Sequence, residues 1–143
     1  MEHYLGIFLY IAGFIIGLGA VTVIDIHGFL GRKSPYWTEA TTRTHKVTKP
    51  LIWLGIILVI IGSYIFYAGD LSGPLLTQFI LAGLLILNGC FLSFRVSPFL
   101  LQREKENRAA ELIPVNWQYK ITASFILSVI GWWGSLVLLV LSL

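Results

Sequence analysis

Four long stretches of this 143-residue chain contain no Asp, Glu, Lys or Arg. Each holds 20 residues or more, and they cover residues 3–24, 50–69, 71–94 and 121–143. Because an α-helix rises about 1.5 Å per residue, each stretch can cross the roughly 30 Å hydrocarbon core of a bilayer. The chain is therefore predicted to be an all-α membrane protein, a bundle of four transmembrane helices. The expected spans are about residues 4–29, 49–69, 73–97 and 117–142.

The composition agrees with a membrane protein of one domain. Hydrophobic residues make up 57% of the chain, and the mean hydropathy is +0.83, whereas soluble domains are only about half apolar. The four spans leave few residues over, so residues 1–143 are predicted to be a single transmembrane domain without a soluble module. The first span has no basic leader and no clear small-x-small cleavage site, so we expect it to be retained.

Basic residues gather on one side of the expected topology. Loops 30–48 and 98–117 carry most of them, whereas the turn at residues 67–74 has only Asp70 and neither terminus has Lys or Arg. Because basic loops stay in the cytoplasm, we expect a multi-pass protein of the bacterial inner membrane with both termini outside and both long loops cytoplasmic. The net charge of +3 suits an anionic lipid surface. No nucleic-acid partner is expected, because no folded basic surface remains.

One short pattern occurs twice in the chain. RKSPY at residues 32–36 follows the first span, and RVSPF at 95–99 follows the third. Downstream, HKVTKP at 45–50 and YKITAS at 119–124 open the next span in corresponding places. The two copies favour a pair of duplicated helical hairpins. Because serine caps helices and proline suits the first helical turn, each Ser-Pro either starts a short interfacial helix or kinks one long helix.

Each expected span has one face of small residues at steps of three and four. These small residues are Gly6, Gly13 and Gly17 on the first span, Gly55 and Gly62 on the second, and Ser124, Ser128 and Gly131 on the fourth. Small faces let helices approach closely in lipid, which predicts a compact bundle with little room for a wide pore. The same faces suit assembly, so a homo-oligomer or a subunit of a larger membrane complex is expected within the lipid bilayer.

Asp25 and His27 stand where the first span meets its loop. His27 continues the small-residue face, while Asp25 lies about 100° around the helix. A carboxylate at that depth needs a partner; Arg95 ends the third span on the same side, and Lys120 begins the fourth. We expect Asp25 to pair with one of these groups, with Arg95 preferred because its guanidinium can form two parallel hydrogen bonds.

Two histidines and one asparagine are further candidates for a site. His27 and His45 flank the first loop, and two histidines on neighbouring helices can serve as axial ligands of haem b. A zinc or copper site would need a third and a fourth ligand at a clear spacing, so no metal ligands are assigned. Asn88 lies in the middle of a span and suits a hydrogen bond between helices or, with Asp25 and Arg95, a polar path.

Four segments carry a resemblance to known proteins: GLGAVTVIDIHGFLGRKS, THKVTKPLIWLG, LNGCFLSFRVSPFL and SVIGWWGSLVL. Together they resemble a family of bacterial four-helix integral membrane proteins of unassigned activity, over nearly the whole chain. The chain is also distantly similar to the copper-resistance D-like and small membrane protoporphyrinogen oxidase families. That similarity implies four or more helices and, in some members, haem. Their functional histidine lies inside the first helix, where this chain has Tyr10 and Gly13, and His27 comes later.

The motifs of common enzymes are absent from the sequence. It has no recognisable catalytic triad, P-loop or glycine-rich dinucleotide turn, so no catalytic residues are assigned and an enzyme is not favoured. The expected function is that of a small integral membrane protein that acts through helix packing with itself or with a larger membrane complex. The alternatives are a haem-b or metal-binding redox protein and an ion or proton conductor.

Overall fold

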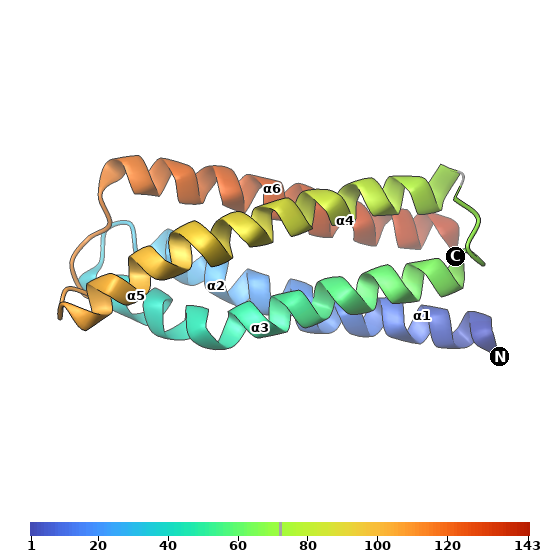
Figure 1. The fold of residues 1–143 in the computed structure, drawn as a ribbon, viewed down its shortest axis with the longest axis horizontal. Coiled ribbons are helices and arrows are strands. Elements are labelled where there is room, and N and C mark those ends of the chain that lie inside the picture. The colour runs from blue at the N-terminus through green and yellow to red at the C-terminus, as the bar shows by residue number, and fades with distance from the viewer. Residues whose placement is uncertain (72) are drawn as a thin grey trace.

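Four helical rods run the length of the molecule in the computed structural model, which describes residues 1–71 and 73–143 (Figure 1). Their segments are α1 (Glu2–Gly13), η1 (Phe14–Leu18) and α2 (Gly19–Leu30); α3 (Pro35–Phe66); α4 (Gly73–Phe91), η2 (Leu92–Val96) and α5 (Ser97–Lys105); and α6 (Val115–Ser142). All four rods are long and apolar enough to cross a membrane, and the described residues include no strand. The all-α four-helix bundle expected from the sequence is confirmed, and the chain is a multi-pass membrane protein.

The two ends of the bundle differ in what they carry. The connections at residues 31–34 and 106–114 lie at one end, which we call the loop end. Both termini lie at the other end, together with the turn between α3 and α4, and we call it the terminal end (Figure 1). This arrangement places both basic connections on one side, as the sequence predicts.

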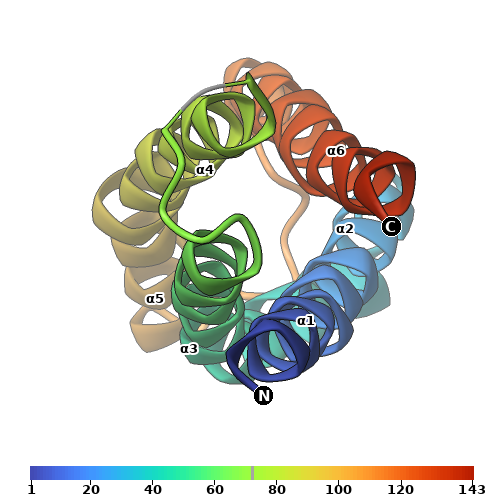
Figure 2. The same ribbon diagram turned by 90° about the vertical axis from the view of Figure 1, so that its right-hand side faces the viewer.

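The rods form a ring when they are viewed along the bundle (Figure 2). The first rod, α1 to α2, packs against α3; α3 packs against α4; and α4 packs against α6. The contact that closes the ring, between α6 and the first rod, is limited and involves η1. Three sides of the bundle are therefore tightly packed and the fourth is more open.

The helices extend beyond the spans expected from the charge-free stretches. The second rod begins at Pro35 instead of near residue 49, and the third continues to Lys105 instead of ending near 97. Residues 35–48 and 98–105 are thus helical and continuous with the spans, in the connections where the sequence predicts either short interfacial helices or kinked long ones. A charge-free stretch marks the part of a helix that lies in hydrocarbon, whereas the backbone hydrogen bonds continue into the polar region beside it.

The two Ser-Pro motifs have different local structures. Ser34 caps α3, since its Oγ accepts a hydrogen bond from the Trp37 backbone N–H at 3.4 Å and Pro35 occupies the first turn. Ser97 and Pro98 instead lie inside one continuous rod, directly after the π-helical turn η2. The missing N–H of Pro98 falls where the α-helical bonding is already interrupted. The first motif therefore starts a helix, and the second continues one.

The first rod and α3 meet with their backbones almost in contact. A Cβ atom added at Gly62 would lie 2.7 Å from Cα of Tyr10 and 2.9 Å from the carbonyl oxygen of Gly6. One added at Gly13 would lie 2.8 Å from the Val59 nitrogen. Only glycine allows such an approach, so the small-residue faces expected from the sequence form this helix pair.

The terminal half of the bundle is filled by aromatic side chains and one polar bridge. Trp132 is 1% exposed and lies edge-on to Phe14, with 6.2 Å between the ring centroids. The Tyr10 hydroxyl donates to Oε1 of Gln78 at 2.6 Å, and both side chains are fully buried. This packing closes the middle of the bundle toward the terminal end.

Candidate functional site

The loop half of the bundle encloses a space that the side chains do not fill. This interior cavity has a volume of about 80 Å³ and is walled by all four rods. Its polar lining residues are Asp25, Thr41, His45, Lys49, Ser93 and Ser124. A cavity of this size, with several polar side chains among its mainly apolar lining, can hold several waters or a small polar group.

Three ionisable groups in this wall, the buried His45 and the half-buried Asp25 and Lys49, have side-chain atoms with no ion-pair or hydrogen-bond partner in the part of the chain that the structure describes. His45 is 8% exposed, and its Nε2 atom has no hydrogen-bond partner. The ion pairs of the described residues involve other carboxylates, namely Glu39, Glu104, Glu106 and Glu111; Asp25 and Lys49 take part in none of them. Ionisable residues within a membrane bundle that face a cavity are functional-site candidates by default.

The cavity wall offers free hydrogen-bond donors to a ligand. The Trp53 indole donates to Oγ of Ser93 at 3.1 Å, which leaves the hydroxyl proton of Ser93 available. Lys49 adds an ammonium group, and His45 adds an N–H if its Nε2 tautomer is protonated. Asp25 supplies the main free acceptor. The wall can therefore donate to a ligand group that accepts several hydrogen bonds.

A second space, the lateral groove, lies on the open side of the bundle between α2 and α6. Its volume is about 360 Å³, and its lining is mainly apolar and includes Leu18, Ile26, Phe29, Val129 and Trp133. Val21, Asp25, Gly28 and Phe125 line both the groove and the interior cavity. The two spaces are thus neighbours that share a wall, and Asp25 lies at their junction.

Gly28 leaves the junction open. A Cβ atom added at this glycine would meet no other atom within 4 Å, in contrast to the crowded glycines between α1 and α3. The residue is helical, so its backbone does not require glycine. A larger side chain here would enter the junction between groove and cavity.

The loop-side end of the groove is closed by one arginine. The Arg32 guanidinium donates to the Thr122 hydroxyl of α6 and lies over the Phe29 ring at 5.6 Å from its centroid. This contact joins the connection that follows α2 to α6, at the loop-side end of the groove. The groove therefore opens sideways, toward the lipid, instead of toward the water at the loop end.

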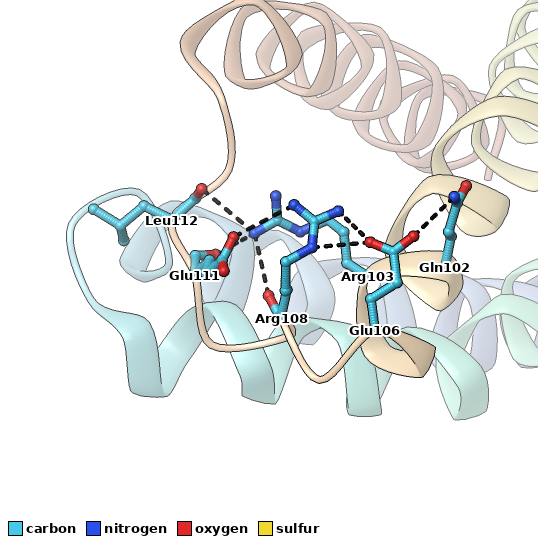
Figure 3. A network of polar contacts seen from close by, with 6 residues as sticks. All are labelled: Gln102, Arg103, Glu106, Arg108, Glu111 and Leu112. Atoms are coloured by element: carbon cyan, nitrogen blue, oxygen red, sulfur yellow. Dashed lines mark hydrogen bonds and ion pairs between the residues drawn. The ribbon is translucent and has the colours of Figure 1, made fainter.

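The cavity is closed at the loop end by a connection that Arg103 holds in place. The buried Arg103 guanidinium donates to three backbone carbonyls of residues 108–112, those of Arg108, Glu111 and Leu112 (Figure 3). Buried arginines of this kind replace water around several carbonyls at once. Ile113, which follows this network, lines the cavity. The connection thus forms the cavity's floor at the loop end.

A charged cluster on the outside of the same connection tightens its turn. Arg108 donates to a Glu106 carboxylate oxygen from Nε at 2.9 Å, and Gln102 donates to the other oxygen at 3.0 Å (Figure 3). The hydrogen bonds from Arg108, followed by that from Gln102, lower the pKa of Glu106. The same pair raises the pKa of Arg108. Both groups are fully exposed, so their attraction is screened by solvent.

The ion pair expected between Asp25 and Arg95 or Lys120 does not form. Arg95 lies in η2 and is exposed. Lys120 is exposed as well, and its ammonium group lies over the Trp117 ring at 4.8 Å. A π turn rotates the chain less per residue than an α-helix, so a straight-helix projection misplaces Arg95. Asp25 instead faces the groove and the cavity.

His27 and His45 do not face a common site. Nδ1 of His27 lies 3.0 Å from the Thr44 hydroxyl, and its ring packs against Trp37, 5.1 Å between centroids. His45 lines the interior cavity, whereas His27 does not. The described residues include no group of three or more His, Cys, Asp or Glu that could hold a metal ion. These residues do not fit a haem bound between two histidines.

Asn88 joins α4 to α6, the role that the sequence favours for it. Its Nδ2 donates to the Ser124 carbonyl at 3.1 Å and to the Ser128 hydroxyl at 2.9 Å. The Ser124 hydroxyl donates back to Oδ1 at 2.7 Å. The asparagine is buried and fully used, so it is a structural bridge between two rods.

Lys49 is the site residue that the sequence reasoning missed. It lies four residues after His45, a spacing that places two side chains on one face of a helix. The second span is expected to begin near residue 49, so the sequence places these two residues at the start of the span and does not show that they lie on one helical face. The long helix α3 unites them. An earlier helix start at Ser34-Pro35 is the signal that reveals the pair.

The fold and the site together define a four-helix membrane protein with an interior cavity, lined in part by ionisable side chains, beside a lipid-facing groove. Comparison with family models, curated proteins and solved structures gives no significant match to this chain. Its function is therefore inferred from the geometry of the described residues.

Proposed function

We propose that this chain is a small, non-enzymatic integral membrane protein that binds a single-chain amphiphile from the surrounding lipid. In this proposal the hydrocarbon chain of the ligand lies in the lateral groove between α2 and α6. Its polar head passes the junction at Gly28 and Asp25 and enters the interior cavity. The observation that carries the proposal is the wall that an apolar groove shares with a smaller cavity, whose lining includes Lys49, His45 and Ser93.

The surroundings of the groove support a hydrocarbon occupant. An empty groove loses dispersion contacts on both of its walls, and in a bilayer the molecules at hand to fill it are hydrocarbon chains. The Arg32–Thr122 contact and the Arg103-held connection favour entry from the side over entry from water. A ligand of this protein is thus expected to arrive by diffusion within one leaflet.

The distribution of basic residues indicates which leaflet of the membrane this is. Lys and Arg concentrate at the loop end, and basic loops favour the cytoplasmic face. We therefore propose that the protein lies in a bacterial inner membrane with both termini outside. The groove then draws its ligand from the cytoplasmic leaflet.

The other functions considered for the sequence receive less support from the geometry. The small faces that favour assembly are used within the chain, at Gly6, Gly13, Gly55 and Gly62. Assembly with itself or with a larger complex stays a prediction that needs other surfaces. An ion or proton conductor is not favoured, because Phe14 and Trp132 fill the bundle beyond the cavity.

Thermal unfolding in detergent with oleyl alcohol, a single chain with one hydroxyl, tests the proposal. Reaction of the half-buried Cys90, the chain's only cysteine, with a thiol-reactive dye reports unfolding. We expect saturable stabilisation of the wild type, about 2.7 kcal/mol at a hundredfold excess over Kd. Gly28→Leu should abolish this stabilisation, because its side chain enters the junction, while the ligand-free variant remains at least as stable as the wild type.

Gly19→Leu is the matched control for this experiment. Gly19 belongs to the same helix, and an added Cβ there also meets nothing within 4 Å, but it does not line the lateral groove. Oleyl alcohol should stabilise this variant as it stabilises the wild type. Equal stabilisation of Gly28→Leu and Gly19→Leu, or no saturable effect on the wild type, would contradict the proposal.

A further inference from the structure

We infer that the interior cavity selects a carboxyl head, so that the ligand is a long-chain fatty acid whose head is bound by Lys49 and His45. The inference rests on the proposed binding function and adds the chemical class of the ligand. It concerns a site that neither the helix packing nor the loop contacts use. Three features carry it: the size of the cavity, its unpaired donors and its balance of charges.

The size of the cavity limits the head group. A dry cavity of roughly 150 Å³ is large enough to bind benzene, whereas the interior cavity here measures about 80 Å³. A quinone ring and a porphyrin are therefore too large for it without rearrangement. A carboxyl, hydroxyl or similar group of a few atoms fits.

The unpaired polar groups of the cavity wall favour a head group whose oxygens accept strong hydrogen bonds. Nε2 of His45 is buried and has no partner, and this residue shares one helical face with Lys49. The free hydroxyl proton of Ser93 lies on the same cavity wall. A carboxyl head can accept from more than one of these donors at once, whereas a hydroxyl head accepts fewer bonds and places no charge beside Lys49.

The charges of the cavity wall accommodate a carboxyl head if this head and Asp25 share one proton. The wall contains one ammonium group, Lys49, and one carboxyl group, Asp25. A bound fatty acid adds a second carboxyl. Two neighbouring carboxyls in a site of low dielectric hold one proton between them, which leaves one negative charge opposite Lys49. The occupied cavity is then neutral, with His45 uncharged.

Arg32 marks the alternative position for an acidic head, at the membrane surface. Its guanidinium already contacts Thr122 and the Phe29 ring at the loop-side end of the groove. A head held there would leave the cavity groups without a role. The two positions depend on different cations, so they can be separated by substitution.

The test compares oleic acid with oleyl alcohol, which have the same chain and different heads. Dissociation constants are measured from thermal unfolding in detergent for the wild type, Lys49→Gln and Lys49→Arg. We expect oleic acid to bind about tenfold more tightly than the alcohol to the wild type, the size of one charge-assisted hydrogen bond. Lys49→Gln should reduce the ratio of the two dissociation constants, alcohol over acid, toward one. Lys49→Arg should retain most of this ratio. His45→Phe should lower it in part.

Two variants control for a general effect of positive charge. Lys46→Gln removes an exposed ammonium group three residues away on α3, where it pairs with Glu104, and should leave the ratio unchanged. Arg32→Gln should also leave it unchanged. Loss of the ratio in Arg32→Gln but not in Lys49→Gln would place the head at the surface and overturn the inference.

The failure of this inference can be told apart from failure of the proposed function. If both ligands bind the wild type equally and Gly28→Leu loses both, the groove binds amphiphiles and the carboxyl selection is wrong. If neither ligand gives saturable stabilisation, the binding function itself is wrong. A ratio that Lys49→Gln leaves intact also excludes the head position proposed here.

Discussion

The contact between the first rod and α3 differs in kind from the contact between the first rod and α6. Along α3 the two backbones meet through glycines, and a methyl group added at Gly62 would overlap Tyr10 and Gly6. Along α6 the same rod leaves a lipid-facing groove, and a methyl group added at Gly28 would meet nothing within 4 Å. One helix thus has a closed side and an open side.

The difference teaches that a glycine in a membrane helix has two opposite uses. Between α1 and α3, glycine allows close packing, where dispersion contacts and backbone proximity hold the pair. At Gly28, glycine keeps a space free beside a carboxylate. Sequence alone assigns both to one class of small residue, and only the arrangement of neighbouring helices separates them.

The largest effect is expected where the packed side is disturbed. Gly62→Ala should destabilise the protein by about 1–3 kcal/mol, because the methyl group would force α1 and α3 apart. Gly83→Ala is the matched control on α4, where an added Cβ meets nothing within 4 Å. It should stabilise by about 0.5–1 kcal/mol through reduced freedom of the unfolded chain. Thermal unfolding in detergent measures both, and shifts of the same sign would contradict the comparison.

A smaller effect is expected at the contact between α4 and α6, which polar bonds hold. Asn88→Leu keeps a similar volume but removes three hydrogen bonds to Ser124 and Ser128. Hydrogen bonds between membrane helices contribute about 0.6 kcal/mol each on average, so we expect the three bonds together to account for a loss of about 1–2 kcal/mol in thermal unfolding.

Thr77→Val serves as the control for Asn88→Leu. Its hydroxyl is exposed and bonds only to the Gly73 carbonyl of its own helix. The stability should remain close to that of the wild type. A loss in Asn88→Leu as large as that in Gly62→Ala would show that polar bonds, not backbone approach, dominate the packed sides.

The smallest effect concerns the connection that closes the cavity. Hydrogen bonds from Arg108 lower the folded-state pKa of Glu106, so the pair stabilises the protein above the usual glutamate pKa of about 4.3. This contribution should be lost as the pH falls from there through the lowered pKa. The unfolding temperatures of wild type and Glu106→Gln should therefore differ at neutral pH and converge in acid. A difference that does not change with pH would rule out this ion pair as its source.

Local features of the chain were predictable from sequence, because they depend on one helix at a time. The four charge-free stretches locate the rods, and the spacing of Gly6, Gly13, Gly55 and Gly62 identifies faces that the structure buries. Asn88 also forms the expected bond between helices. Helical periodicity and hydrocarbon thickness are sufficient for these predictions.

The candidate site was less predictable, because it depends on how helices are rotated against one another. The expected Asp25–Arg95 pair is wrong, since Arg95 lies exposed in a π turn. The groove exists because α6 does not cover one face of α2, and the residues of α2 do not by themselves show where α6 packs. The pair of His45 and Lys49 depends on a helix that begins at Ser34-Pro35, and the second Ser-Pro motif shows that such a start cannot be read from the dipeptide alone.

The π turns η1 and η2 have a consequence for how such a protein can change. Each lies within a rod, between a half that packs near the terminal end and a half that reaches the loop end. A π turn holds one residue more than the α-helical turn that it replaces, so removing one residue from 14–18 would restore regular helix and leave α2 in nearly the same rotation against α1. Asp25 and Gly28 would keep their direction toward the groove, whereas the same deletion in a regular part of the rod would rotate everything beyond it by about 100°. The π turns are therefore the places where a rod can gain or lose one residue without changing which side of α2 faces the groove.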